Sequence, residues 1–244
     1  MTQPEGQRYD ELWSGAWEQA ASIGPGFVSR HRMLVRLLRR YPCPGRLLDV
    51  GAGQGHLLTR IAAAFPMLEL DAHETAPLAL DRLRQHAAIG TVLEGALEGL
   101  PPSHYDAIVC SEVLEHIEDD QAAIASMARA LTPGGRLFLT VPRRQKLWTP
   151  LDDAVGHLRR YEDGQLERLC STCGLIVDCS MAVGAPLYNS YYTLLGGRSP
   201  QASASLSKSL LARAAARVLT EVFSLETHWS SPWGGRGVVV ARKG

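Results

Sequence analysis

Short apolar runs alternate along the chain with longer stretches whose apolar residues recur every three or four positions. The short runs predict buried strands, and the helical period predicts amphipathic helices. We expect strands at residues 47–50, 68–73, 91–93, 107–110, 136–141, 175–179 and 237–242. We expect helices at about 54–65, from the second strand to 88, at 119–131 and at 163–173. This alternation predicts an α/β fold with a doubly wound, mostly parallel sheet.

A glycine-rich turn follows the first predicted strand, in the segment Asp49-Val50-Gly51-Ala52-Gly53-Gln54-Gly55-His56-Leu57. Glycine is needed where a chain turns at positive φ and where a ligand approaches the backbone closely. The next helix directs its free N–H groups at this turn, which would stabilise a strongly polar ligand group. The third glycine comes one residue too early for the dinucleotide motif. Asp49 would attract an ammonium group and repel a pyrophosphate, so nicotinamide and flavin are disfavoured.

Three later segments complete a set of motifs in a fixed order. Glu74 and Thr75 follow the second strand, where a carboxylate can bind both hydroxyls of a ribose. The sequence Ser-Glu-Val-Leu-Glu-His follows the fourth strand at 111–116, and Pro133-Gly134-Gly135 precedes the fifth. With the glycine turn, these segments resemble the motifs of class I S-adenosylmethionine-dependent methyltransferases, in particular a bacterial subgroup like types 11 and 23 whose acceptors are mostly unassigned.

The resemblance implies a Rossmann-like sheet of seven strands with an antiparallel last strand, and an enzyme that binds S-adenosyl-L-methionine. The implied cofactor site consists of Asp49, Gly51, Ala52, Gly53, Gly55, Glu74, Thr75, Ala96, Leu97, Cys110 and Glu112. Ala96 replaces an aspartate of the family, so we expect backbone rather than a carboxylate beside the adenine ring. The implied reaction moves a methyl group to an oxygen, with nitrogen or carbon as alternatives, of a small-molecule acceptor in bacterial specialised metabolism.

Glu112, Glu115 and His116 would share one face if the stretch after the fourth strand began a helix. With His157, they would form a site for Mg²⁺ or another divalent ion. This set resembles that of small-RNA 2′-O-methyltransferases, and its first three members also resemble ubiquinone-pathway O-methyltransferases. Such an ion would lower the pKa of an acceptor hydroxyl. In the alternative without an ion, His157 or His116 acts as general base, or both are structural.

Residues 1–45 predict a helical lid, with helices at 9–21 and 30–41 separated by the break Gly24-Pro25-Gly26. An apolar stripe on the second helix lies opposite four arginines, Arg32, Arg36, Arg39 and Arg40. In one interpretation, such an arginine binds the carboxylate of the cofactor. In the alternative, the four form the solvated face of a packing helix.

Residues 182–236 predict an insertion before the last strand, which leaves 46–181 and 237–244 as the cofactor-binding core. The insertion combines a serine-rich linker at 199–209, an alanine-rich helix ending near 223, and the aromatic residues Tyr188, Tyr191, Tyr192, Trp229 and Trp233. We interpret it as a cap that covers the substrate. The alternative is an additional packing layer or an oligomer contact.

Composition narrows the partners. The 244 residues have a formal net charge of +0, which makes nucleic acid an unfavoured partner. No apolar run is long enough to cross a bilayer. The polar N-terminal residues and five scattered cysteines predict a cytoplasmic protein without structural disulfides. The sequence leaves the oligomeric state open between a monomer and a homodimer. Cys170 and Cys173 lack a second pair, so we expect buried thiols rather than a zinc site.

The residues Arg143, Arg144, Lys146, Arg159 and Arg160 follow the fifth strand, and either bind an anionic substrate or form a solvated rim. Three other functions remain open. They are a metal-dependent RNA 2′-O-methyltransferase, a non-catalytic cofactor-binding partner subunit, and a nicotinamide-dependent oxidoreductase. The spacing of the glycines argues against the last of these.

Overall fold

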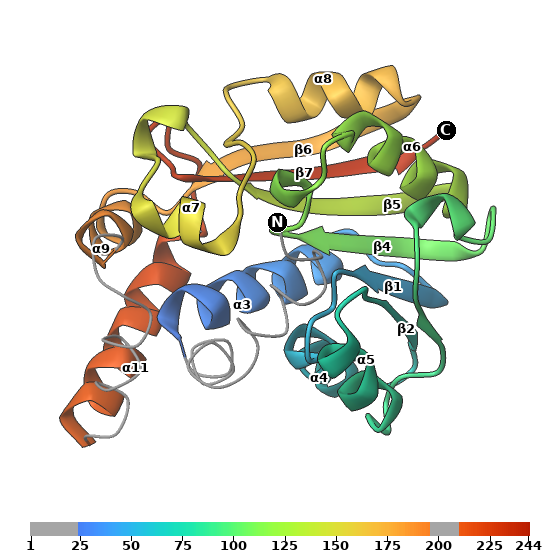
Figure 1. The fold of residues 1–244 in the computed structure, drawn as a ribbon, viewed down its shortest axis with the longest axis horizontal. Coiled ribbons are helices and arrows are strands. Elements are labelled where there is room, and N and C mark those ends of the chain that lie inside the picture. The colour runs from blue at the N-terminus through green and yellow to red at the C-terminus, as the bar shows by residue number, and fades with distance from the viewer. Residues whose placement is uncertain (1–23, 196–209) are drawn as a thin grey trace, which may run out of the picture.

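A computed structural model describes residues 24–195 and 210–244. Its seven-stranded sheet has the order β3-β2-β1-β4-β5-β7-β6 (Figure 1). The strands are β1 (Arg46–Val50), β2 (Glu69–His73), β3 (Val92–Leu93), β4 (Tyr105–Ser111), β5 (Leu131–Pro142), β6 (Leu175–Val183) and β7 (Arg236–Lys243). Strands β1 to β5 pair in parallel, whereas β7 pairs antiparallel with both β5 and β6. The predicted Rossmann-like fold with an antiparallel last strand is confirmed.

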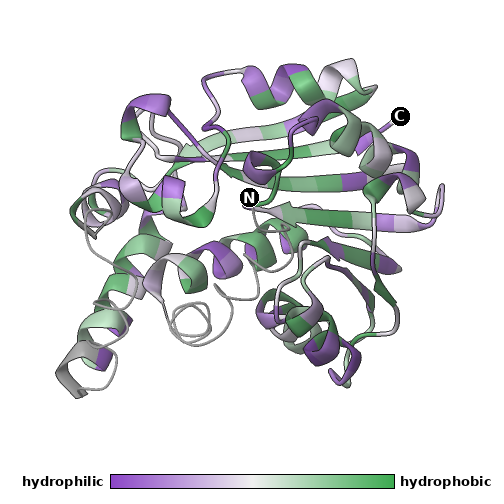
Figure 2. Cartoon of the chain, in the orientation of Figure 1, coloured by the Kyte–Doolittle hydropathy of each residue, from purple (hydrophilic) through white to green (hydrophobic). Residues whose placement is uncertain are grey.

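Helices cover both faces of the sheet because successive strand residues point to opposite sides. Phe138 packs on the face covered by α3 (Pro25–Arg40), α4 (His56–Ala64) and α5 (Pro77–Arg84). Leu139 packs on the face covered by α6 (Asp120–Ala130) and α8 (Gln165–Thr172). Figure 2 shows hydrophobic residues along the strands and on the helix faces that meet them. Burial on both faces explains why the strands are continuous apolar runs in the sequence.

The remaining helices are α7 (Pro150–Val155), between β5 and α8, and α9 (Leu187–Leu195) and α11 (Leu210–Glu226), between β6 and β7. Helix α11 packs against α3 and extends beyond it (Figure 1). Arg32 Nη1 lies 2.8 Å from Glu221 Oε1, and Arg36 Nη2 donates to the carbonyl oxygen of Thr227 at 2.5 Å. Helix α3 therefore joins the inserted segment to the sheet.

Several boundaries differ from those expected. Helix α3 begins at Pro25, inside the predicted break, because proline is well suited to the first turn of a helix. Strand β6 continues to Val183 and β7 begins at Arg236, so the insertion covers residues 184–235. The helix predicted at 9–21 and the linker predicted at 199–209 lie outside the described residues.

The strand order reverses between β1 and β4, and ligands of such sheets bind where the strands end near this point. The turns after β1 and β4 are therefore the expected place for a site. Within the described residues, no helix has the length and apolar character needed to traverse a bilayer. Cys170 is fully buried in the core, as expected, whereas Cys173 is only partly buried, contrary to the expectation of two buried thiols.

Candidate active site

A cavity of about 250 Å³ opens at the carboxyl ends of β1 and β4. The glycine turn, the turn after β4, α3, α7, α9 and the start of β7 contribute to its lining. The predicted site residues that line it are Asp49, Gly51, Ala52, Gly53, Glu112, His116 and His157. Seven other predicted site residues are set back from it: Gly55, Glu74, Thr75, Ala96, Leu97, Cys110 and Glu115.

Positive φ angles and a close neighbouring side chain explain the glycines of the turn. Gly51 has φ of +67°, and a Cβ there would lie 2.4 Å from Cγ2 of Val113. Gly53 also has positive φ, and its N–H donates to Glu74 Oε2 at 2.7 Å. The other oxygen of Glu74 accepts the N–H groups of Thr75 and Ala76. Glu74 is thus fixed directly beside the turn, although it does not line the cavity.

Asp49 lies under this turn and is 2% exposed. Burial, followed by the charge of Glu74, raises its pKa to about 8, and Arg30 opposes the shift. A carboxylate with so high a pKa is stabilised in its ionised form by any cation placed beside it. The site is therefore suited to a positively charged ligand group.

The segments after β3 and within β4 offer little side-chain chemistry. Ala96 is exposed and precedes a short 3₁₀ turn, Leu97–Gly99, whose first residue is buried. Glu94 is turned toward Arg84, with Oε2 2.8 Å from Nη2. Burial raises the pKa of Cys110 well above its usual value, and its side chain lies in the core of the sheet. A ligand would meet Cys110 through backbone atoms alone.

The stretch after β4 does not begin a helix, so the condition for a shared face of Glu112, Glu115 and His116 is not met, whereas the helix predicted at 119–131 is present. Glu112 has φ of +57°, only Leu114–His116 form a 3₁₀ turn, and α6 begins at Asp120. Glu112 and Glu115 consequently have different surroundings. Glu112 Oε1 lies 3.3 Å from Nε of Arg236, and Oε2 lies 3.7 Å from Nη1 of Arg30. Burial alone would raise the pKa of Glu112, but these two guanidinium groups outweigh it and lower the pKa.

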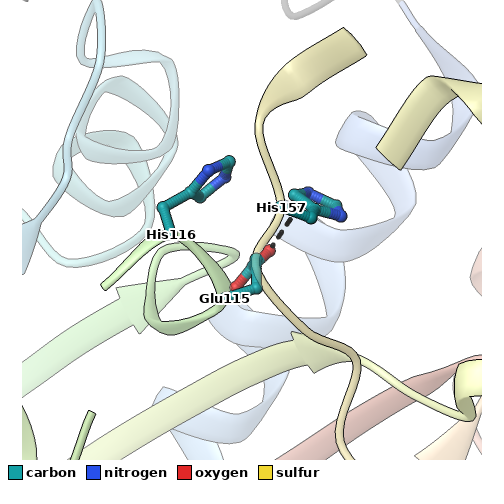
Figure 3. A group of neighbouring side chains, drawn as sticks. All are labelled: Glu115, His116 and His157. Atoms are coloured by element: carbon teal, nitrogen blue, oxygen red, sulfur yellow. Dashed lines mark ion pairs between the residues drawn. The ribbon is translucent and has the colours of Figure 1, made fainter. Parts of the chain in front are cut away.

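Glu115, His116 and His157 converge, with one ligand atom of each within 4.8 Å of the others (Figure 3). Glu115 is fully buried and neither of its oxygens has a hydrogen-bond partner. Burial, then the charge of Glu112, raises the pKa of Glu115 well above its usual value. An unpaired buried carboxylate is costly, so this group is either protonated or bound to a cation. The predicted metal set is thus reduced to three residues, without Glu112.

Both histidines have a defined partner at Nδ1. His157 Nδ1 lies 2.7 Å from Asp152 Oδ1, and His116 Nδ1 lies 3.3 Å from the carbonyl oxygen of Gly156. His157 Nε2 lies 3.7 Å from Glu115 Oε1. Outer partners of this kind fix the ring orientation of histidines that bind metal ions. One carboxylate and two imidazoles fit a divalent ion with coordination positions left for exchangeable ligands.

The wall opposite the glycine turn contains residues that the sequence did not indicate. Arg236, the first residue of β7, is 2% exposed. Its guanidinium carbon lies 4.5 Å from the centre of the Tyr188 ring, and the guanidinium donates a hydrogen bond to the hydroxyl of Tyr188. Arg30 lines the cavity from α3, and its Nε has no hydrogen-bond partner. Arg236 directly precedes the apolar run Gly-Val-Val-Val, and this position at the start of a strand could have indicated a buried functional arginine.

Only some aromatic residues of the predicted cap line the cavity. Tyr188 and Tyr192 line the cavity, with ring centres 4.5 Å apart. Tyr191 instead packs against Phe223, and the rings of Trp229 and Trp233 are exposed and do not line the cavity. Two tyrosines of α9, together with Phe27 of α3, therefore supply the aromatic rings of Phe and Tyr that line the cavity.

Most of the arginines suggested for ligand binding have other partners. Arg143 and Arg144 donate to the carbonyl oxygens of Gly234 and Pro232, and Arg159 pairs with Asp120. Lys146 lies over the ring of Trp233. Only Arg160 of this group lines the cavity, where it pairs with Asp152. On α3, the predicted Arg32, Arg36, Arg39 and Arg40 do not line the cavity, whereas Arg30 does.

Comparison with known proteins identifies the family. A family model described as a methyltransferase domain matches residues 28–180, which is more than half of the chain. The chain therefore belongs to the class I S-adenosylmethionine-dependent methyltransferases, as the motifs predicted.

Among curated proteins, the chain is 32% identical over 150 residues to the ubiquinone biosynthesis O-methyltransferase of Xylella fastidiosa (strain 9a5c), covering 58% of this chain and 60% of that one. It is 29% identical over 153 residues to the malonyl-[acyl-carrier protein] O-methyltransferase of Hahella chejuensis, covering 58% and 54%. The chain therefore matches less than two thirds of the length of either relative.

Solved structures agree on the fold. Magnesium protoporphyrin IX methyltransferase from Synechocystis with bound S-adenosylhomocysteine has a TM-score of 0.59 at 15% identity, covering 98% of this chain and 94% of that one. A [4+2]-cyclase has a TM-score of 0.60 at 20% identity, covering 99% and 84%. The same fold thus supports different reactions, and the reaction must be argued from the site.

Proposed function

We propose that this chain transfers a methyl group from S-adenosylmethionine to a hydroxyl of a small molecule, and that Glu115, His116 and His157 bind a divalent cation beside that hydroxyl. The observation that carries the proposal is the buried carboxylate of Glu115, which has no hydrogen-bond partner and faces two oriented imidazoles. The names of both curated relatives, which are O-methyltransferases, support oxygen as the accepting atom.

We define the donor side as Asp49, the glycine turn, Arg30 and the adjacent Glu74, which together match the amino-acid tail and the ribose of the cofactor. Asp49, with its raised pKa, favours the ammonium group of the methionine moiety. Arg30, whose Nε is unpartnered, is placed to bind the carboxylate. Glu74 is fixed beside the glycine turn, where it can accept hydrogen bonds from ribose hydroxyls. Arg30 thus takes the part that the sequence suggested for other arginines of α3.

The acceptor side consists of Glu115, His116, His157, Tyr188, Tyr192 and Arg236. The sulfonium methyl is already activated, so the protein must align the hydroxyl for in-line displacement and remove its proton. A divalent cation, when bound, lowers the pKa of an acceptor hydroxyl. Tyr188 and Tyr192 supply apolar aromatic surface beside the acceptor.

A second mechanism on the same residues does without a cation. If His157 donates from Nδ1 to Oδ1 of Asp152, which lies 2.7 Å away, its Nε2 carries the lone pair and can accept the hydroxyl proton. The two mechanisms make opposite predictions for metal removal. An RNA acceptor and a non-catalytic role remain weaker alternatives, since most of the basic residues after β5 have partners within the protein. A cytoplasmic location and a role in specialised metabolism stay predictions.

Calorimetric titration with S-adenosylmethionine tests the donor side, and we expect saturable heat at one site per chain. Absence of heat and of any thermal shift at millimolar cofactor would contradict the proposed function as a whole. Turnover is then measured with a panel of hydroxylated small molecules and a control oligonucleotide, before and after dialysis against a chelator. We expect activity with a small molecule, loss after dialysis, and recovery with Mg²⁺, Mn²⁺ or Zn²⁺. Unchanged turnover after dialysis would support His157 as general base and reject the cation.

A further inference from the structure

Asp152 accepts more hydrogen bonds than the capping of a short helix requires. It is the third residue of α7, and its Oδ2 accepts from the N–H and the hydroxyl of Thr149 in a capping box. Its Oδ1 lies 2.7 Å from His157 Nδ1 and 2.9 Å from Arg160 Nε, and its Oδ2 lies 2.8 Å from Arg160 Nη2. The carboxylate is 2% exposed. Asp152 therefore connects a helix terminus, an arginine fork and a histidine of the cavity.

The backbone around His157 is also restrained. The chain turns at Gly156, which has φ of +80°, and the N–H of His157 donates to the carbonyl oxygen of Asp152 at 2.9 Å. The N–H of Leu158 donates to the carbonyl oxygen of Glu115 at 2.8 Å. These bonds fix the position of the imidazole relative to Glu115. They do not determine which of its nitrogens carries the proton.

We propose that Asp152, supported by Arg160, is a positioning residue that holds His157 as the tautomer with hydrogen on Nδ1, so that the lone pair of Nε2 faces Glu115. An ionised carboxylate only accepts hydrogen bonds, and the atom opposite it in this pair is Nδ1. Arg160 occupies both oxygens of Asp152 in a bidentate pair, which holds the carboxylate in one orientation. This inference rests on the proposed function only in taking His157 as the residue that meets the acceptor or the cation.

The contacts of Arg160 support the assignment of Asp152 as a positioning residue. Capping requires only Thr149 and Asp152 of this group, whereas Arg160 lies beyond the end of α7 and contributes nothing to the cap. Arg160 nevertheless reaches back to the carboxylate and also donates to the carbonyl oxygen of Arg143 at the end of β5. The Asp152–Arg160 pair thus connects the loop that contains His157 to the segment just after β5. Such a connection is expected of residues that orient His157.

The test uses the full chain with ¹⁵N-labelled histidine and an Asp152→Asn variant. The amide keeps an oxygen for the Thr149 cap, yet its nitrogen can donate to His157 Nδ1 and so favours the opposite tautomer. In the wild type, at a pH where the ring is neutral, we expect the nitrogen shifts of a proton on Nδ1. In the variant we expect a proton on Nε2, and a fall in kcat of about 100-fold to 10,000-fold with KM changed far less. Asp152→Glu should restore part of the rate.

Asp153→Asn is the matched control, because Asp153 lies on the same helix, is exposed and bonds to the indole N–H of Trp148. It should leave the tautomer and the rate unchanged. A wild-type spectrum with the proton on Nε2 overturns the inference without any variant, even if Asp152→Asn fails to fold. An Asp152→Asn protein that keeps the Nδ1 proton and the rate also overturns it. Failure of the proposed function is distinct, since the tautomer is observed without an acceptor or a cofactor.

Discussion

The donor and acceptor sides of the cavity are built in different ways. Asp49 lies in β1, and Gly51 and Gly53 lie in the turn that follows it; their roles depend on burial, positive φ and backbone N–H groups. On the acceptor side, Glu115, His157 and Arg236 come from three distant segments, and their roles depend on side-chain contacts between those segments. Apart from Arg30 and Glu74, the donor side is a local property of one strand and its turn. The acceptor side exists only when the whole sheet and the inserted helices have assembled.

This difference implies that the two sides are separable by mutation. A change on the acceptor side should impair turnover and leave cofactor binding intact. A change on the donor side should impair binding of the cofactor itself.

Among changes made directly to residues of the two sides, the largest effect is expected for Glu115→Gln. We expect kcat to fall by about 100-fold to 1,000-fold while the affinity for S-adenosylhomocysteine stays within about twofold. Burial raises the pKa of Glu115, so above its ordinary pKa the carboxyl group costs stability that increases as the pH rises toward the shifted value. The neutral amide removes this cost, and the melting temperature at neutral pH should therefore rise. Glu118 is an exposed carboxylate nearby, so Glu118→Gln is the control and should change neither kcat nor the melting temperature.

A smaller effect is expected for the donor side. The ionised form of Asp49 is the one that binds an ammonium group, and its pKa in the free protein is about 8. Binding at pH 7 should therefore release close to one proton, and affinity should rise up to about tenfold per pH unit until pH 8 and then level off. Calorimetry in two buffers of different ionisation enthalpy measures the proton release. Asp49→Asn should abolish the release and weaken binding by about 10-fold to 100-fold, whereas a wild-type count of zero protons would refute the assignment.

Arg30 offers a test of which cofactor group meets which residue. Arg30→Met should weaken S-adenosylhomocysteine by about tenfold, because one charged hydrogen bond to the carboxylate is lost. Methylthioadenosine lacks the amino-acid tail, so its affinity should stay unchanged. Arg32→Met, which removes a surface pair with Glu221, is the matched control and should affect neither ligand. Equal weakening of both ligands by Arg30→Met would show that Arg30 does not bind the tail.

The smallest effect concerns the adenine ring. Ala96 has no side-chain acceptor for the adenine amino group, and Glu94 is occupied with Arg84. We therefore expect N6-methyl S-adenosylhomocysteine to bind within about threefold of the unmodified ligand in a titration. A loss of tenfold or more would mean that some other group accepts a hydrogen bond from this amino group.

The sequence predicted most of what depends on local pattern. Each strand, the glycine turn and the carboxylate after β2 is formed by a short local segment. The geometry of such a segment follows from φ, burial and strand direction. The sharp turn at Glu112, which has a left-handed backbone, was not predicted because periodicity does not reveal such a turn. The convergence of Glu115, His116 and His157 does not require a helix there, since it depends on where the chain returns after β5.

Arg30 and Arg236 were missed for a different reason. The periodicity of α3 distinguishes its apolar stripe from its polar side, but several arginines lie on the polar side and tertiary contacts decide which one faces the cavity. Arg236 is buried because Glu112 and Tyr188 compensate its charge, and both partners are far away in the sequence. Composition cannot indicate such compensation.

The position of β7 has a consequence for how the protein matures on the ribosome. It is inserted between β5 and β6, and it is the last strand of the described fold in chain order. Until it emerges, the nascent chain leaves the facing edges of β5 and β6 unpaired and lacks the guanidinium that neutralises Glu112. Chaperone dependence and the onset of acceptor recognition should therefore both change at the point of translation at which β7 emerges.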